Sequence, residues 1–303
     1  MALGGGVAGV LRMRPLSVGD ILDETLLIFR RQFLAFVTLT AVVVVPSALL
    51  SLGSLVLVSM LTGAMASNRV SGETAMVLAF GSLAITVPVA LVTGLGRLMS
   101  GVVAVKVSAD VILGRPIDIW AAYRQVFGRL GPLLLAGFLV GMVTGAAALC
   151  FPVAIFFALS WGLIFPVIVL EGHGGVEAMR RSWNLMRGNR WRLLGCTVLI
   201  GIIVTILVAL PASLFAVLAA VWLAITPAVL SNSGGMFTVQ AGQVIVQALG
   251  ETVFGAIGYI VMTRFYFDVR VRKEAFDLEL RLNRLTDTLA STPSGAPVPP
   301  PPL

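Results

Sequence analysis

The stretch IVLEGHGGVEAMRRSWNLMRGNRWRLLG, residues 168–195, determines how this chain is organised. An apolar run ends here at Glu171, a glycine-rich turn follows, and a basic, aromatic segment leads into a second apolar run. Arginine and tryptophan between two long apolar runs are typical of a loop at a membrane surface. The stretch therefore predicts that the chain crosses a membrane on either side of it.

The composition agrees with this interpretation. Of the 303 residues, 58% are hydrophobic and only 12% are charged, whereas an ordinary soluble domain is about 25% charged. The formal net charge is +7, but the basic residues cluster between apolar runs. Such clusters fit anionic lipid headgroups. We expect the lipid bilayer and anionic headgroups on its cytoplasmic side as partners, and no nucleic acid.

The fold predicted from the apolar runs is all-α, a polytopic membrane protein with six transmembrane helices. The fifth run is too long for one straight span, so we expect a kink or break near Pro211. The second helix is expected to continue past Arg97 and Lys106 toward Gly114. The predicted spans are 33–61, 75–95, 131–150, 153–170 and 193–225, and a sixth that ends near 264–267.

The basic residues predict the orientation. Arginine and lysine lie before the first span, after the sixth, and in every second loop, while the opposite loops hold Arg69 alone. By the positive-inside rule both termini are then cytoplasmic, and we expect a multi-pass protein of the bacterial plasma (inner) membrane.

Four regions are expected along the chain: a disordered N-terminus at 1–15, a six-helix membrane domain at 16–267, a cytoplasmic amphipathic helix at 268–290, and a proline-rich disordered tail at 291–303. Ser17 and Asp20 have the spacing of a capping box that opens an interfacial amphipathic helix. Leucines up to Leu289 follow Val271 at heptad-like spacing, which indicates either a short coiled-coil seam or an interfacial or intramolecular helix.

A faint internal repeat is a further hypothesis. Aligning Asp20, Asp118 and Glu177 brings Thr25, Tyr123 and Ser182 into register, and a pair of apolar runs follows each segment. This predicts three units of an interfacial helix plus a helical hairpin. The alternative is that any basic amphipathic helix before a membrane span shows the same pattern.

Three pieces of the chain resemble a known family: RPLSVGDILDETLLIFRRQF at 14–33, the stretch at 168–195, and YFDVRVRKEAFDLEL at 266–280, with GRPIDIWAAYRQVFGRL at 114–130 as a looser match. They are similar to the membrane-domain family associated with glycerophosphoryl diester phosphodiesterases, which has many stand-alone actinobacterial members. A phosphodiesterase of that type needs a separate soluble barrel with paired histidines and metal-binding carboxylates. This chain has one histidine, His173, so the resemblance implies a membrane domain without the catalytic domain.

The sixth span carries the candidate intramembrane polar face, formed by Gln243, Gln247 and Glu251, with Gln240 one turn earlier. Their spacing of three and four residues places them on one side of a helix. Counted along a straight helix from Arg264, Glu251 lies about 20 Å inside the membrane. An acid at that depth is a functional candidate. The alternative is that the span begins late and the stripe lies at the outer interface.

The basic segment supplies candidate headgroup contacts, which are Arg180, Arg181, Arg187, Arg190, Trp183 and Trp191. Topology and aromatic anchoring explain the same residues equally well. We attribute Arg97 to snorkelling at the end of its span, and expect Glu171 to cap or charge the start of the helix at 176–187. His173 has no second histidine or cysteine nearby in the sequence, so we expect no metal site. The sequence shows no catalytic set and no nucleotide-binding motif, and we expect no cofactor.

Two functions from different classes follow. The first is a non-enzymatic membrane scaffold or partner subunit, since no catalytic constellation is evident. The alternative is a transporter or lipid-handling protein that uses the polar face of the sixth helix. An enzyme is the third and weakest candidate, because Glu251 and Glu171 have no visible catalytic partner.

The orientation is testable directly. A cysteine introduced at Arg69 is expected to react with a membrane-impermeant thiol reagent added to intact cells, because this loop is predicted to face outward. Mass spectrometry of the labelled protein measures the reaction. Labelling only after cell lysis would reverse the orientation.

Overall fold

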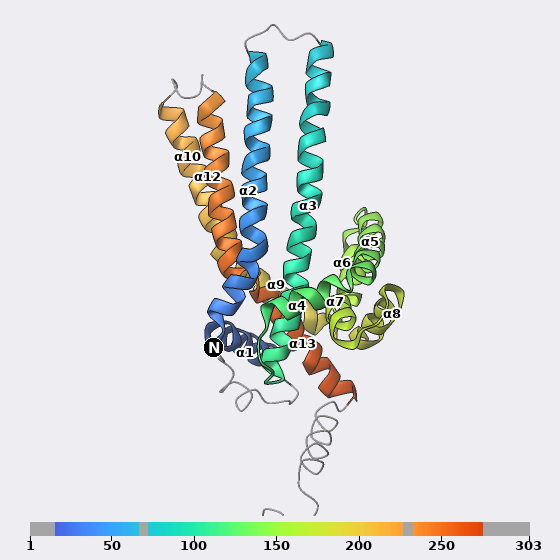
Figure 1. The fold of residues 1–303 in the computed structure, drawn as a ribbon. Helices are drawn as coiled ribbons and strands as arrows, with labels where there is room; N and C mark the ends of the chain where they lie inside the picture. Colours follow the sequence, from blue (N-terminus) through green and yellow to red (C-terminus); the bar gives the residue numbers. More distant parts are fainter. Residues whose placement is uncertain (1–15, 67–71, 227–232, 275–303) are drawn as a thin grey trace, which may run out of the picture.

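The computed structural model describes residues 16–66, 72–226 and 233–274, and these parts contain helices and no strand. The all-α prediction is confirmed. Two long hairpins extend from a cluster of shorter helices (Figure 1). The predictions for 1–15, for Arg69, for the tail at 291–303 and for the heptad-like spacing beyond 274 lie outside the described residues.

Six segments of the described chain are long and apolar enough to cross a membrane, which confirms a multi-pass membrane protein. The first covers 33–61, as predicted. Their side chains are largely uncovered, as at Phe138 and Phe151, which are 67% and 73% exposed. Apolar side chains in such numbers need lipid around them. The helices are α2 (Phe33–Ala66), α3 (Gly72–Ile112), α5 (Leu130–Ala147), α6 (Phe151–Ser160), α9 (Arg190–Val204), α10 (Leu210–Ile225) and α12 (Ser233–Phe254).

The fourth and fifth spans depart from regular α-helix. In the fifth, the π-helical turn η2 (Thr205–Ala209) joins α9 to α10, and Pro211 occupies the first turn of α10. Proline lacks an N–H, and the local change of winding accommodates it. The predicted fourth span is not one helix, because α6 ends at Ser160 and the short α7 (Ile164–Pro166) and the π-helical η1 (Val167–Glu171) follow a turn. By contrast, α3 runs unbroken to Ile112, as expected.

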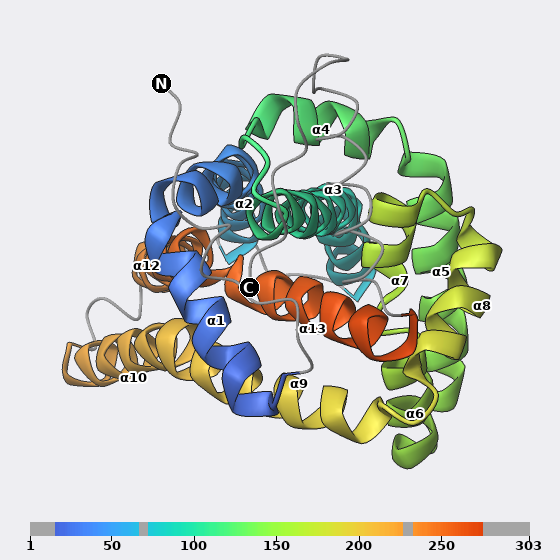
Figure 2. The same ribbon diagram turned by 90° about the horizontal axis from the view of Figure 1, so that it is seen from below.

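The sixth span also breaks. A turn at Gly255 and Ala256 separates α12 from α13 (Ile257–Glu274), which crosses beneath the bundle (Figure 2). The predicted boundary between 267 and 268 therefore lies inside a continuous helix. The chain changes direction at Gly255, about a dozen residues before this predicted boundary.

Short amphipathic helices precede the apolar pairs: α1 (Val18–Arg31), α4 (Ile119–Phe127) and α8 (Gly175–Met186). The capping box of α1 is confirmed, since Ser17 Oγ accepts from the Asp20 N–H and the Asp20 carboxylate accepts from the Ser17 N–H. The order of one short helix and then two apolar segments occurs three times, and the aligned Thr25, Tyr123 and Ser182 are all buried. This order is what the repeat hypothesis predicts.

Most of the buried core lies around α13 rather than among the spans. It is built from α1, the C-terminal half of α3, η1, α8 and α9, which lie around α13, and from α4, which packs on α3 (Figure 2). The Tyr123 hydroxyl, for example, is buried there and donates to the Leu39 carbonyl at 2.8 Å. Burial raises the pKa of this hydroxyl.

A buried carboxylate joins three distant parts of the chain. The Asp268 side chain is 0% exposed; it accepts from the Leu16 N–H at 2.7 Å, from Arg192 at 3.0 Å and from Arg272 at 3.1 Å. Arg192 and Arg272 each also donate to the Leu16 carbonyl at 2.7 Å. The start of α1 is thus held to α9 and α13 by charge-assisted hydrogen bonds.

Two further ionic contacts use the same helix. Arg264 is 1% exposed and pairs with Glu24 of α1. Two residues farther along α13, the Tyr266 hydroxyl donates to Glu171 at 2.7 Å, and Glu171 also accepts from Arg181 of α8 at 2.9 Å. Arg181 and Arg270 both pair with Glu274. Side chains of all three resemblance pieces therefore meet along α13.

We expect Asp268→Asn to lower the free energy of unfolding by about 3 kcal/mol, because removing one partner of a buried ion pair leaves uncompensated charge. Asp118→Asn is the matched control, since the exposed Asp118 caps α4 and asparagine caps equally well. Thermal unfolding in detergent measures both. Equal stability of the two variants would contradict a supporting role for Asp268.

Candidate functional site

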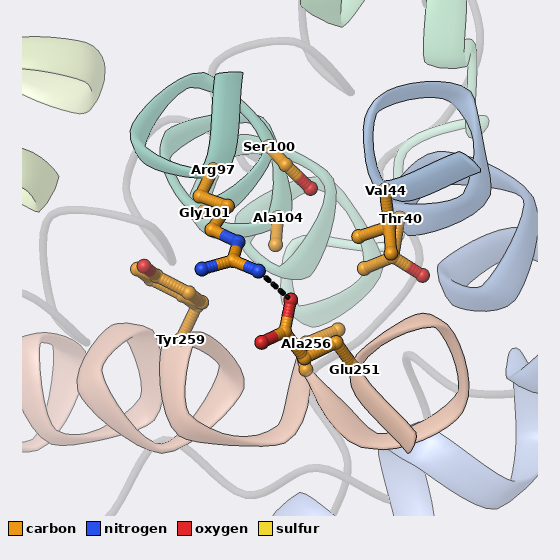
Figure 3. Close-up of a pocket in the computed structure, with 10 residues that line it drawn as sticks. Thr40, Val44, Arg97, Ser100, Gly101, Ala104, Glu251, Ala256 and Tyr259 are labelled. Carbon is orange, nitrogen blue, oxygen red and sulfur yellow. Dashed lines mark ion pairs between the residues drawn. The ribbon is translucent and has the colours of Figure 1, made fainter. Parts of the chain in front are cut away.

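Two opposite charges from different spans meet between α3 and α12. Arg97 Nη2 lies 3.1 Å from Glu251 Oε2 (Figure 3). Gln247 Nε2 donates to the other carboxylate oxygen at 3.0 Å. The Glu251 side chain is 23% exposed and the Arg97 side chain 53%. The pair is therefore formed but not enclosed, and the guanidinium keeps room for a further partner.

The pair borders a cavity of about 190 Å³ between α2, α3 and the α12–α13 turn. Figure 3 shows Tyr259 and Ser100 beside the guanidinium and Thr40 on the opposite wall. The cavity thus combines one ion pair with hydroxyl groups and apolar walls. Its full lining is Thr40, Val44, Arg97, Ser100, Gly101, Ala104, Glu251, Gly255, Ala256 and Tyr259.

The turn at Gly255 positions Glu251 at the cavity. A Cβ at this glycine would lie 2.4 Å from the Glu251 carbonyl oxygen, so no other residue fits this backbone. The last carbonyls of a helix lack intrahelical partners. Here the Thr40 hydroxyl of α2 donates to the Thr252 carbonyl. This bond ties the end of α12 to α2 where the cavity lies.

A second glycine positions Tyr259. A Cβ at Gly101 would lie 2.1 Å from Cζ of the Tyr259 ring. The ring therefore packs directly on the α3 backbone, and its hydroxyl lies beside the cavity (Figure 3). The close approach of the two helices depends on the missing side chain at Gly101.

Farther along α12, a more open hollow of about 430 Å³ lies between α2, α3 and α12. Gln243 and Gln247 line it, and Gln247 also bonds Glu251. The structure thus brings the three residues of the predicted polar face together on one side of α12. Their polar neighbours in this hollow are Ser51, Ser54, Thr86 and Gln240.

The depth of Glu251 in the membrane stays a prediction. The count from Arg264 assumes a straight helix, and the turn at Gly255 interrupts it. The partner gives a better measure: Arg97 follows Met76, the first residue of its apolar span, by 21 residues, or about 32 Å of helix. The hydrocarbon core is about 30 Å thick. A core that began at Met76 would end near Arg97, although the apolar span of α3 continues to Ile112.

Arg97, which we attributed to snorkelling, is the partner of Glu251. The available signal was the presence of one isolated cation and one isolated anion in two different apolar runs. Nothing in the sequence showed that these runs face each other, because α3 and α12 are more than a hundred residues apart.

The predicted headgroup residues have different surroundings. Arg180, Arg187 and Trp191 are exposed. Arg181 bonds Glu171 and Glu274, and the hydrogen bond to Glu171 is the main reason that its pKa is raised. Trp183 packs in an aromatic cluster with Phe156, Phe157 and Trp161. Arg190 lies over that cluster. Headgroup binding by these residues stays a prediction.

Glu171 does not cap α8. The N-cap residue of this helix is Gly174, and no side chain caps the helix start. It binds Arg181 and Tyr266 instead, since the chain reverses at Gly172, where φ is +83°. His173 lies beside Glu171 and Glu177, at 3.4 and 3.6 Å. Within the described residues, no group of three or more potential metal ligands is found.

These features define a polytopic membrane protein with a polar cavity at one end of its spans. Residues 138–285 match the family model described as the membrane domain of glycerophosphoryl diester phosphodiesterase. The match confirms the predicted resemblance and concerns the membrane domain, not the catalytic domain. The matched segment includes Glu251 and most of the residues that bind the Glu171 and Asp268 carboxylates, while α1 to α4 precede it. Comparisons with curated proteins and with solved structures gave no significant match.

We expect Gly101→Ala to destabilise the protein by about 1–3 kcal/mol, because the new Cβ displaces Tyr259 from α3. Gly94→Ala on the same helix is the control: it meets nothing within 4 Å, and alanine favours helix. Unfolding midpoints of the two variants are compared. A Gly101→Ala protein as stable as the Gly94→Ala protein would rule out this packing constraint.

Proposed function

We propose that this protein binds a polar or polar-headed ligand at the Arg97–Glu251 cavity and acts in transport or lipid handling. The observation that carries the proposal is the half-exposed ion pair at the level where two apolar spans, those of α3 and α12, meet. Charged side chains facing lipid at this level are unfavourable unless they are paired or hydrated. Glu251 satisfies only part of the guanidinium, so a ligand with hydrogen-bond acceptors has a place beside it.

The surroundings support a ligand. Binding sites combine apolar walls with a few convergent polar groups, and here Tyr259 and Ser100 line the cavity beside one ion pair. Gln247 connects this cavity with the larger hollow along α12, because it lines the hollow and bonds Glu251. A headgroup or a small solute at Arg97 would thus have a polar path along α12.

A scaffold or partner subunit is the second candidate. Gln240, Gln243 and Gln247 are exposed on α12 within a predicted span. Amide side chains at such positions form hydrogen bonds to neighbouring helices. A helix of another membrane protein could therefore cover this face, with the stripe as its contact surface.

We also propose in which membrane the protein lies and which way it faces. The family match concerns a membrane domain and not a hydrolase, which supports a non-enzymatic role. The basic loops support placement in the plasma membrane with both termini in the cytoplasm. In this orientation the cavity lies near the cytoplasmic leaflet, where it would take ligands from that leaflet or from the cytoplasm.

The test compares wild type with the neutral variant Arg97→Gln/Glu251→Gln, each extracted with its native lipids in polymer discs. Mass spectrometry identifies the lipids, solutes and proteins that are retained. We expect one lipid or solute class to fall about tenfold or more in the variant, since hydrogen bonds to charged groups have this weight. Removing both charges avoids leaving either one unpaired.

Lys106→Gln/Asp110→Asn is the matched control, because it neutralises another ion pair of α3 that does not line the cavity. Retention should match wild type in this control. If all three proteins retain the same lipids and solutes, the cavity is not a ligand site. If one protein copurifies with all three forms, the scaffold function replaces the proposal.

A further inference from the structure

A separate hollow lies on the other side of the molecule, where α6 faces the start of α9. Its volume is about 430 Å³, within the range of about 300–1,000 Å³ that small-molecule sites occupy. One wall consists of Pro152, Ile155, Phe156 and Leu159 of α6, and Arg190 and Trp191 form the other side. The hollow is therefore apolar along α6 and carries a cation at one edge.

Arg190 is held in place by aromatic rings. Its Cζ lies 4.4 Å from the centroid of the Phe156 ring and 4.9 Å from that of Trp183. Trp183 in turn packs against Trp161 and Phe157. Stacking of this kind fixes the guanidinium plane without neutralising its charge. The group is thus preorganised for a further partner.

The charge of Arg190 is not used by the ionic contacts of the core. Arg181 and Arg192 of the same basic segment pair with Glu171 and Asp268. No carboxylate of the described residues pairs with Arg190, and its buried Nε has no hydrogen-bond partner among them. A buried donor without a partner is unfavourable. None of the described residues supplies an acceptor for the Arg190 Nε.

We propose that this hollow binds one anionic phospholipid, with an acyl chain along α6 and the phosphate at the Arg190 guanidinium. Charge complementarity selects the headgroup, and the apolar wall selects the chain. Trp191, beside the hollow, is 83% exposed, as is typical of a tryptophan at the membrane–water interface. This site does not depend on the function proposed for the Arg97–Glu251 cavity.

The experiment titrates phosphatidylglycerol and phosphatidylcholine onto the delipidated full chain in detergent and counts bound lipids by native mass spectrometry. Arg190→Gln should weaken phosphatidylglycerol binding about tenfold or more, the weight of a charge-assisted hydrogen bond. Arg180→Gln removes the same charge from the exposed face of α8 and should weaken binding less than about fivefold. Glycerol phosphate added in excess should not displace the lipid.

Ile155→Trp provides an independent variant, because it fills the hollow and leaves Arg190 and its aromatic neighbours in place. It should weaken phosphatidylglycerol binding to a similar extent even if Arg190→Gln fails to fold. Equal losses in Arg190→Gln and Arg180→Gln would reduce the effect to diffuse surface charge and overturn the site. Displacement by glycerol phosphate, or unchanged binding in Ile155→Trp, would overturn the acyl-chain contact.

Discussion

The structure depends on the burial of one carboxylate, that of Asp268. A fully buried charge is tolerated only when several donors satisfy it, and here these donors come from the start of α1, from α9 and from α13 itself. The position of α13 is therefore fixed by residues from both ends of the chain. Arg264 pairs with Glu24, and Glu171 binds Tyr266 and Arg181. These contacts hold the part of α13 that precedes Asp268.

This arrangement separates two kinds of stability. The spans expose apolar side chains and need lipid as their solvent, whereas the core around α13 is closed by packing and by paired charges. The Arg97–Glu251 cavity lies at the junction of the two regions, directly above the turn at Gly255. Arg190 lies at a corresponding junction on the side of α6. In both places a guanidinium retains binding capacity next to apolar surface, which is the chemical requirement for recognising an amphiphile.

Local patterns predicted the elements well. The span at 33–61, the capping box at Ser17 and Asp20, and the continuation of α3 past Lys106 all depend on residues close together in sequence. The errors share one cause. The continuous helix expected through Gly255 and the capping role of Glu171 were inferred along a regular helix, and contacts with Thr40 and Tyr266 from other elements decide them.

The sequence by itself determined the solvent of this protein, the number of its spans and the resemblance of its C-terminal half to a known membrane-domain family, because apolar run length and side-chain order are local properties. Its basic loops also predict which way the protein faces. Only the tertiary structure decided which charges are partners. Arg181, Arg190 and Arg192 are near neighbours in one basic segment, yet one binds Glu171, one stacks on aromatic rings and one binds Asp268. Helix geometry points these side chains in different directions, and what each one meets depends on α6 and α13, which pack there from elsewhere in the chain.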